Sequence, residues 1–247
     1  MKTVIITGGN KGIGFDLVSS FLNENYNVIV GARSDNGFQD RLSKKIIFKS
    51  IDVKNQKDHF SLVDLAIQKF GSLDCYVNNA GFSAWKPIEE IEEDFIDDIL
   101  STNLKGTLWG CKAAASLMKE GGSIINISSI AGKRGSANNS AYCSSKFGVN
   151  GLTQSLSKEL GPRGIRVNAL CPVLIKTEGL SEALLEKFSP AKSNPDKFIA
   201  DFARDNAALK RLPTGAEVGK MAVFLASDNS SAITGQCINV DCGVFPQ

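Results

Sequence analysis

Short apolar runs alternate with amphipathic stretches along most of the chain. Several of the runs are apolar throughout, which is typical of parallel strands whose two faces are both covered by helices. After the first run, Leu17, Val18 and Phe21 recur at helical spacing. The pattern predicts strands at residues 4–7, 28–32, 46–51, 73–77, 123–127, 165–170 and 237–240.

The regular alternation of strand and helix predicts right-handed βαβ units and an α/β fold. We expect one doubly wound, Rossmann-type domain over residues 1–247, with a seven-stranded parallel sheet and helices on both faces. Longer helices are expected at about 92–119 and 140–160, and a shorter one at about 215–226. The sequence has no linker rich in Pro, Gly or Ser and no internal repeat, so nothing in its pattern divides the chain.

Residues 173–212 depart from this rhythm. They contain two helical fragments, at about 180–189 and 196–206, interrupted by a Ser-Pro and an Asn-Pro pair. A long insertion after a strand is usually a functional lid or a mobile loop, and we expect this one to fold over the site as a substrate lid. Four of its apolar residues would line a substrate pocket, pack in the core or contact another subunit: Leu174, Leu180, Leu184 and Phe188.

Composition narrows the classes of partner. The formal net charge of +2 is small and no basic block is present, so neither nucleic acid nor an acidic membrane is an expected partner. Met1 is followed at once by a strand-like segment, which leaves no room for a signal peptide, and no apolar run approaches the ~18 residues of a membrane span. We expect a soluble, cytoplasmic protein.

The six cysteines and the one histidine offer no metal site. No cysteines form a C-x-x-C pair and most lie among apolar or small residues, so we expect buried, reduced thiols. His59 follows Lys57 and Asp58 in a polar stretch, and we interpret it as a solvated helix residue rather than a ligand or base. No transition metal is expected.

A glycine-rich segment joins the first strand to the first helix. Glycines allow the backbone to approach a pyrophosphate, and the N-terminus of a helix offers free N–H donors and a favourable dipole. The spacing G-x-x-x-G-x-G differs from the common G-x-G-x-x-G dinucleotide fingerprint. The expected cofactor contacts in this segment are Gly8, Asn10, Lys11, Gly12, Ile13 and Gly14.

The end of the second strand bears on the choice between NAD and NADP. An acid there would bind the adenosine 2′-hydroxyl, whereas an arginine would accommodate a 2′-phosphate. The segment has Ala32 in place of an acid and continues with Arg33 and Ser34. Lys11 adds a second cation near the same phosphate, so the sequence predicts NADP(H). The alternative is that both cations are solvated surface residues.

Two residues with acid–base chemistry lie four positions apart. Tyr142 and Lys146 share one face of a predicted helix, and a nearby ammonium would favour the phenolate and lower the pKa of the phenol. The preceding predicted strand ends in two hydroxyl residues, Ser128 and Ser129, either of which would face the phenol across a cleft. The pair alone is weak evidence, because Tyr and Lys are common on solvated helix faces.

Taken in order, these motifs resemble the short-chain dehydrogenase/reductase family over about residues 3–243, most of all its carrier-protein 3-oxoacyl reductases and related ketoreductases. The resemblance selects Ser129, thirteen residues before Tyr142 (142 − 129), and adds Asn103, which implies an Asn-Ser-Tyr-Lys tetrad. It also implies further cofactor contacts at Asp52, Val53, Asn79, Ala80, Gly81, Pro172, Val173, Ile175 and Thr177, besides Arg33, Ser34, Tyr142 and Lys146.

The resemblance implies carbonyl/alcohol interconversion with NADP(H), acting on a small-molecule substrate. Ser129 and Tyr142 would bind the carbonyl, and Tyr142 would donate the proton. Lys146 would bind the nicotinamide ribose, and Asn103 would hold a helix carbonyl and a water in a proton relay. Relatives commonly form homodimers or homotetramers through their two long helices. Two departures from the family pattern are Val173, where glycine usually follows Pro172, and Cys242, also where glycine is usual.

Two other functions remain open on the sequence. One is a catalytically silent NADP(H)-binding sensor or regulator on the same fold, which the intact tetrad disfavours. The other is sugar-nucleotide epimerase or dehydratase chemistry, whose enzymes share Y-x-x-x-K but are usually longer and have a different glycine spacing. The sequence does not identify the substrate.

Overall fold

The computed structural model describes residues 1–35, 37, 46–118, 121–191 and 194–246. Its centre is a sheet of seven strands, all parallel, in the order β3-β2-β1-β4-β5-β6-β7. The expected doubly wound Rossmann-type fold is confirmed. The strands are β1 (Thr3–Thr7), β2 (Asn27–Ala32), β3 (Ile46–Ser50), β4 (Cys75–Asn78), β5 (Ser123–Ile127), β6 (Arg166–Pro172) and β7 (Cys237–Val240).

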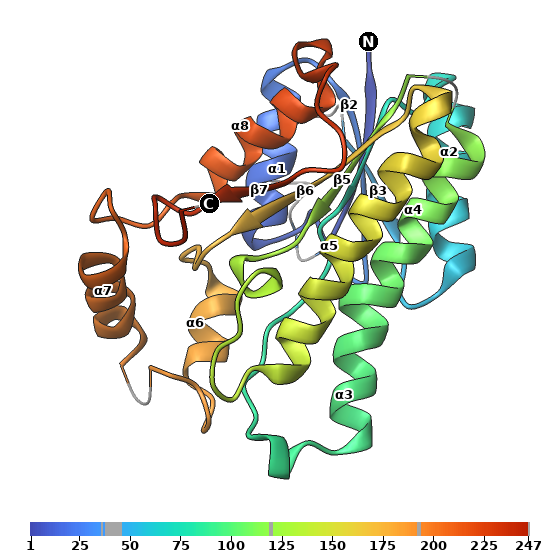
Figure 1. Cartoon of the computed structure of the whole chain (residues 1–247). Coiled ribbons are helices and arrows are strands. Elements are labelled where there is room, and N and C mark those ends of the chain that lie inside the picture. The colour runs from blue at the N-terminus through green and yellow to red at the C-terminus, as the bar shows by residue number, and fades with distance from the viewer. Residues whose placement is uncertain (36, 38–45, 119–120, 192–193, 247) are drawn as a thin grey trace.

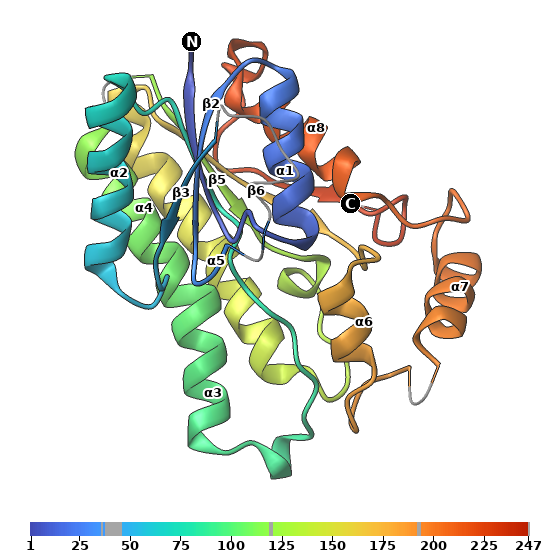
Figure 2. The same ribbon diagram turned by 180° about the vertical axis from the view of Figure 1, so that it is seen from behind.

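Helices cover both faces of the sheet, as Figures 1 and 2 show. On one face α1 and α8 pack on the strands through residues such as Leu17, Phe21 and Leu225. On the other face α2, α4 and α5 do so. The helices are α1 (Gly12–Asn23), α2 (Gln56–Phe70), α3 (Glu93–Leu100), α4 (Gly106–Leu117), α5 (Ser140–Leu160), α6 (Glu178–Leu184), α7 (Pro195–Asn206) and α8 (Gly215–Ala226).

The helix expected at about 92–119 is interrupted. A π-helical turn, Ser101–Lys105, separates α3 from α4 and contains the buried Asn103. A π turn inserts a residue into the helical register, and such turns often occur at functional sites. Hydrophobic spacing does not reveal it, because both flanking helices keep an apolar face on either side of the turn.

Residues 173–212 leave the sheet after β6 and form α6 and α7 at one end of the molecule (Figure 1). The sequence explains where α7 begins, because Pro195 occupies its first turn and Asn194 caps it by accepting the Lys197 N–H at 3.0 Å. Thr177 caps α6 in the same way, accepting the Leu180 N–H at 3.2 Å.

Two expectations about unusual side chains have different outcomes. All six cysteines are free; four are buried, and Cys237 and Cys242 are half-buried. The interpretation of His59 as a solvated residue is wrong, because the side chain is completely buried. Within the described residues, no helix is long and apolar enough to cross a bilayer, and no three His, Cys, Asp or Glu side chains are grouped so as to hold a metal ion.

Candidate active site

The sequence motifs converge on one edge of the sheet. Strands β1 and β4 are neighbours, and the chain turns in opposite directions from them, toward β2 and β3 on one side and toward β5 to β7 on the other. In open parallel sheets, ligands bind beyond the carboxyl ends of the strands at such a switch point. The glycine-rich turn follows β1, and the segment with Asn79, Ala80 and Gly81 follows β4.

The glycine-rich turn has a shape that side chains would block. Gly8 has a φ of +65°, in the left-handed region, and a Cβ on Gly14 would lie 2.0 Å from the Gly8 carbonyl oxygen. The turn delivers the chain into α1, whose N-cap Lys11 makes no side-chain capping bond. The first-turn N–H groups of α1 are therefore suited to bind an anion.

Hydrogen bonds fasten this turn to the end of β4. The Asn79 side chain donates to the carbonyls of Thr7 and Gly8 at 2.9 and 3.1 Å. The Thr7 hydroxyl accepts the N–H groups of Asn79 and Ala80 at 3.1 and 3.2 Å. Asn79, expected as a direct cofactor contact, therefore also sets the position of the phosphate-binding turn. Thr7 had not been singled out from the sequence.

Strand β2 ends in the buried Ala32, where no acidic residue stands, and the chain becomes exposed at the next residue. The side chains of Arg33 and Lys11 are exposed. The Asn10 side chain donates to the Ser34 carbonyl at 2.8 Å, which links the glycine-rich turn to the segment after β2. The exposed Arg33 therefore follows the end of β2, where the adenosine 2′ position of a dinucleotide is expected, on a segment that Asn10 holds.

The turn after β3 is held by the beginning of α2. The Asp52 N–H donates to an Asp58 carboxylate oxygen at 2.8 Å, and the Val53 carbonyl lies 2.9 Å from Nε2 of His59. Sequence reasoning missed His59 because the two residues before it, Lys57 and Asp58, are charged. Its spacing from Leu62, Val63 and Ala66 was the available signal, since these positions share one buried helix face.

Tyr142, Lys146 and Ser129 meet beyond the end of β5. Lys146 is 5% exposed, donates to the Ile127 carbonyl at 2.9 Å and lies 5.7 Å from the centre of the Tyr142 ring. The Ser129 side chain hydrogen-bonds the Tyr142 phenol. Ser128, the alternative hydroxyl, donates instead to the Lys146 carbonyl at 3.3 Å. Of the two serines, the geometry places Ser129 beside the phenol.

The pKa of the phenol departs from the sequence expectation. Burial raises the pKa of Tyr142 to about 12, and the hydrogen bond with Ser129 offsets only part of that rise. Burial also lowers the pKa of Lys146 to about 8. Desolvation is the largest influence on the pKa of this phenol, and Lys146 is not among its causes, so the expected lowering by Lys146 stays a prediction. Near neutrality, Tyr142 is a protonated phenol and thus a proton donor.

Asn103 connects three segments near this centre. Its side-chain amide donates to the Phe82 carbonyl at 2.9 Å and the Ser145 hydroxyl at 3.2 Å, and its side-chain oxygen accepts the Phe82 N–H at 3.0 Å. A Cβ on Gly81 would lie 2.9 Å from that oxygen and 3.7 Å from Lys146 Nζ. The structure thus brings all four tetrad residues to one region and explains why glycine occupies position 81.

The segment from Pro172 to Thr177 lies over the same edge. The Pro172 carbonyl accepts the Ser129 hydroxyl at 3.4 Å, and the Thr177 methyl lies 3.5 Å from a Cβ placed on Gly12. Val173 is buried in a small apolar cluster with Ile130, Ala207 and Val244. The β-branched side chain of Val173 thus packs between the turn after β5, which contains Ile130, and the C-terminal segment, which contains Val244.

The insertion after β6, expected from the sequence to act as a lid, packs on an aromatic residue from the segment after β4. Trp85, in the segment after β4, is buried in a cluster with Ala183, Leu184 and Ala191. Leu180 and Phe188 pack against the same cluster, whereas Leu174 packs with Val173. Three of the four apolar lid residues singled out from the sequence therefore gather around Trp85.

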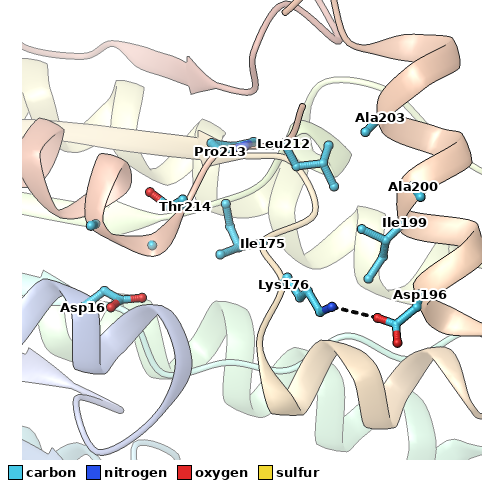
Figure 3. A pocket seen from close by; sticks show the side chains of 12 residues that line it. Asp16, Ile175, Lys176, Asp196, Ile199, Ala200, Ala203, Leu212, Pro213 and Thr214 are labelled. Atoms are coloured by element: carbon cyan, nitrogen blue, oxygen red, sulfur yellow. Dashed lines mark ion pairs between the residues drawn. The ribbon is translucent and has the colours of Figure 1, made fainter. Parts of the chain in front are cut away.

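A pocket of about 530 Å³ opens beside α7, where the insertion after β6 meets α1 and α8 (Figure 3). It lies between α1, α7 and the start of α8, with Asp16 on one side and an ion pair of 2.8 Å between Lys176 and Asp196 on another. Burial raises the pKa of Asp16. None of the four tetrad residues lines this pocket, but Ile175, an expected cofactor contact, does.

Comparison with known proteins agrees with this geometry. A family model described as enoyl-(acyl carrier protein) reductase matches residues 8–245. A diacetyl reductase [(S)-acetoin forming] of Staphylococcus epidermidis is 36% identical, with 98% of each chain covered. A 3-oxoacyl-[acyl-carrier-protein] reductase of Chlamydia muridarum is 33% identical over 98% of this chain and 97% of its own.

Solved structures show the same relationship. The ligand-free aldohexose dehydrogenase of Thermoplasma acidophilum has a TM-score of 0.89 and 32% identity, covering 98% of this chain and 93% of its own. A short-chain dehydrogenase/reductase of Brucella melitensis, titled glucose/ribitol dehydrogenase, has a TM-score of 0.90 and 29% identity, covering 100% and 97%. The chain belongs to the short-chain dehydrogenase/reductase family. It is an oxidoreductase of that family, whose members use a nicotinamide cofactor, NAD(P)(H).

Proposed function

We propose that this protein reduces a small ketone to a secondary alcohol with NADPH. The observation that supports this most directly is the grouping of a protonated Tyr142 phenol with Ser129, Lys146 and Asn103 beyond the end of β5. A catalytically silent sensor would not require a phenol held in this way.

Tyr142 and Ser129 together form a site for a carbonyl oxygen. Both hydroxyls donate hydrogen bonds toward the oxygen, and they stabilise the negative charge that develops on it as the carbon accepts hydride. Tyr142 then transfers its proton to that oxygen. The high pKa of the phenol keeps the proton in place near neutrality, which suits the reductive direction.

Lys146 and Asn103 hold the surroundings of the phenol. Lys146 is anchored by the Ile127 carbonyl, and its remaining N–H groups are available to the ribose hydroxyls of a bound dinucleotide. Asn103 fixes the backbone at Phe82 and thereby the segment that follows β4. These residues orient the reacting groups, which supplies much of the rate advantage of a preorganised site.

The residues at the sheet edge fit a nicotinamide dinucleotide. The glycine-rich turn packs so closely on the start of α1 that a Cβ on Gly14 would collide with the Gly8 carbonyl, and the first turn of α1 has uncapped N–H groups suited to a pyrophosphate. When bound, the cofactor supplies the hydride. Ala80, Gly81, Pro172 and Thr177 lie along the proposed path from the pyrophosphate to the reactive ring.

Preference for the 2′-phosphate rests on Arg33 and Lys11. Replacing Arg33 by Ala removes a charge-assisted hydrogen bond, so we expect kcat/KM for NADPH to fall about tenfold while that for NADH changes little. Arg204→Ala, an exposed change on α7, serves as the control. Equal or better use of NADH by the unmodified protein would contradict the NADP(H) assignment.

The proposed substrate is small because the lid already closes on Trp85. We propose that residues 173–212 act as the lid of a single-domain enzyme, with the apolar cluster around Trp85 limiting the length of the substrate. The relatives named for diacetyl reduction and for 3-oxoacyl reduction set the two ends of the size range to test.

The decisive experiment follows NADPH consumption with diacetyl, 3-oxoacyl thioesters and keto sugars. We expect turnover with the smallest ketones and a loss of about 10³-fold in kcat for Tyr142→Phe, which keeps the ring and removes the proton. Binding of NADPH without turnover of any carbonyl would favour the sensor instead.

We also propose that the protein is a homodimer or homotetramer that buries the outer faces of α4 and α5. Leu108 on α4 and Phe147 on α5 are large apolar side chains that are 38% and 47% exposed in the single chain. Sedimentation equilibrium of the wild type and of Phe147→Glu tests this contact, and a wild-type monomer at micromolar concentration would contradict it.

A further inference from the structure

The buried histidine lies beside the proposed adenine end of the site. His59 is in the first turns of α2 and is 0% exposed. Its Nδ1 lies 2.8 Å from the Tyr76 hydroxyl and its Nε2 lies 2.9 Å from the Val53 carbonyl oxygen. A buried polar ring with both nitrogens paired is costly to replace and holds its partners in fixed positions.

The chemistry of the partners fixes which nitrogen carries the proton. The Val53 carbonyl only accepts hydrogen bonds, so Nε2 must carry the hydrogen. Burial lowers the pKa of His59, so the ring is neutral near pH 7 and Nδ1 accepts the Tyr76 O–H. Burial also raises the pKa of Tyr76 well above its usual value, so that hydroxyl keeps its hydrogen. The result is a series of hydrogen bonds between uncharged groups, which runs from Tyr76 in β4 through His59 in α2 to Val53 in the turn after β3.

This chain of bonds ends on a turn whose other groups are also held. The Asp52 N–H donates to Asp58, and Asp52 Oδ1 accepts the Lys54 N–H at 3.0 Å. A Cβ on Gly106 would lie 3.1 Å from the Val53 carbonyl oxygen, so helix α4 closes the space behind it. Within the described residues, no acceptor pairs with the Val53 N–H, which leaves that donor for a ligand.

We propose that His59 is a positioning residue for the adenine end of the dinucleotide. Through Nε2–H it holds the Val53 carbonyl, and thereby keeps the Asp52–Val53 turn in the shape that presents the Val53 N–H and the Asp52 carboxylate to the base. Tyr76 backs the ring from the sheet. The inference rests on the proposed binding of NADP(H), because only then does the turn face an adenine.

The test compares two replacements of His59 by titration calorimetry with 2′,5′-ADP, an adenosine fragment, and with NADPH. Leucine removes the donor to Val53, and we expect about tenfold weaker binding of both ligands, the effect of losing one hydrogen bond to a buried carbonyl. Glutamine can place an amide N–H where Nε2 lies, so His59→Gln should restore binding to within about threefold of wild type. The KM for NADPH should rise with His59→Leu while kcat at saturating NADPH stays nearly unchanged.

A matched control separates positioning from general loosening of the core. Val63 is buried on the same face of α2 and has no side-chain hydrogen-bonding group, so Val63→Ala should lower the melting temperature while leaving both dissociation constants unchanged. Equal weakening by Val63→Ala, or wild-type affinity in a folded His59→Leu protein, would overturn the inference alone. Failure of the wild type to bind 2′,5′-ADP and NADPH would overturn the proposed function with it.

A second test of the proposal follows the resonances of His59 in the wild-type protein. The chain has one histidine, so its imidazole ¹⁵N and N–H resonances need no assignment by mutagenesis. We expect the Nε2–H tautomer at pH 7, and a shift of that proton resonance on titration with 2′,5′-ADP. The Nδ1–H tautomer, or a resonance that does not respond to saturating 2′,5′-ADP, would contradict the proposal.

Discussion

At the cofactor edge the backbone is held by polar side chains, whereas the insertion proposed as a lid is held to the rest of the molecule by apolar contacts. Thr7, Asn79 and Asn10 bind the glycine-rich turn and its neighbours through directed hydrogen bonds. The insertion proposed as a lid instead rests on Trp85, and the pair between Lys176 and Asp196 joins two of its own segments. Directed bonds specify one geometry, while apolar contacts tolerate sliding, so one region is suited to a constant ligand and the other to closure.

The largest effect is expected at the cofactor edge, with Gly14→Ala. Its Cβ would lie 2.0 Å from the Gly8 carbonyl oxygen and 2.7 Å from the Asn79 amide nitrogen, so the turn must open. We expect NADPH affinity to fall about 100-fold, equivalent to about 3 kcal/mol. Calorimetric titration measures it, and Gly161→Ala, whose Cβ would meet nothing within 4 Å, is the control.

A smaller effect is expected on the lid side, with Trp85→Ala. The change removes the surface on which Leu184 and Ala183 rest, so the lid closes less often and KM for the ketone rises about tenfold. NADPH affinity should stay the same, because the hydrogen bonds around the glycine-rich turn are untouched. The KM for the ketone of Trp85→Phe should lie between those of the wild type and Trp85→Ala. Equal losses of ketone and NADPH affinity would mean that the two regions are not independent.

The pH dependence of stability tests the polar side of the comparison. The pKa of His59 is lowered by burial, so the unfolded chain binds a proton more readily below its ordinary pKa of about 6.5. The free energy of unfolding therefore decreases as pH falls from about 6.5 toward the lower pKa of His59 in the folded state. The resulting loss is at most about 2 kcal/mol at pH 5. Urea unfolding of wild type and His59→Gln should show this slope only in the wild type.

The smallest effect concerns the departure at Cys242. This residue has a φ of +54°, in the left-handed region, where a residue other than glycine is strained. Cys242→Gly should raise the unfolding free energy by about 0.5–1 kcal/mol, read as a higher melting temperature. Asn25 has a similar φ of +59°, but asparagine tolerates it, so Asn25→Gly should stabilise less or not at all.

The strands and most helices were predictable because their apolar periodicity reports burial directly. The strand at 123–127 and the helix at 215–226 agree with the observed bounds of β5 and α8. The glycine-rich turn and the Tyr142–Lys146 spacing were readable because local geometry requires those residues. Their roles, like those of the other site residues, stay proposals.

Other features depend on partners far away in the chain. The contact between His59 and Tyr76 joins residues seventeen positions apart (76 − 59) on a helix and a strand, and the charged residues before His59 concealed it. The π turn that holds Asn103 arises from packing against α5 and the Phe82 segment. The pKa of Tyr142 depends on how completely its surroundings exclude water, which spacing along a helix does not encode.

The order of the strands also has a kinetic consequence. Strands β1, β2 and β3 lie side by side and are synthesised first, but β1 must also accept β4, whose residues come some seventy positions later (75 − 4 = 71). The outer strand β7 follows β6 only after a long interval (237 − 172 = 65). Such non-local pairing slows folding, so a chain still being synthesised exposes an open edge at β6 until β7 has emerged from the ribosome.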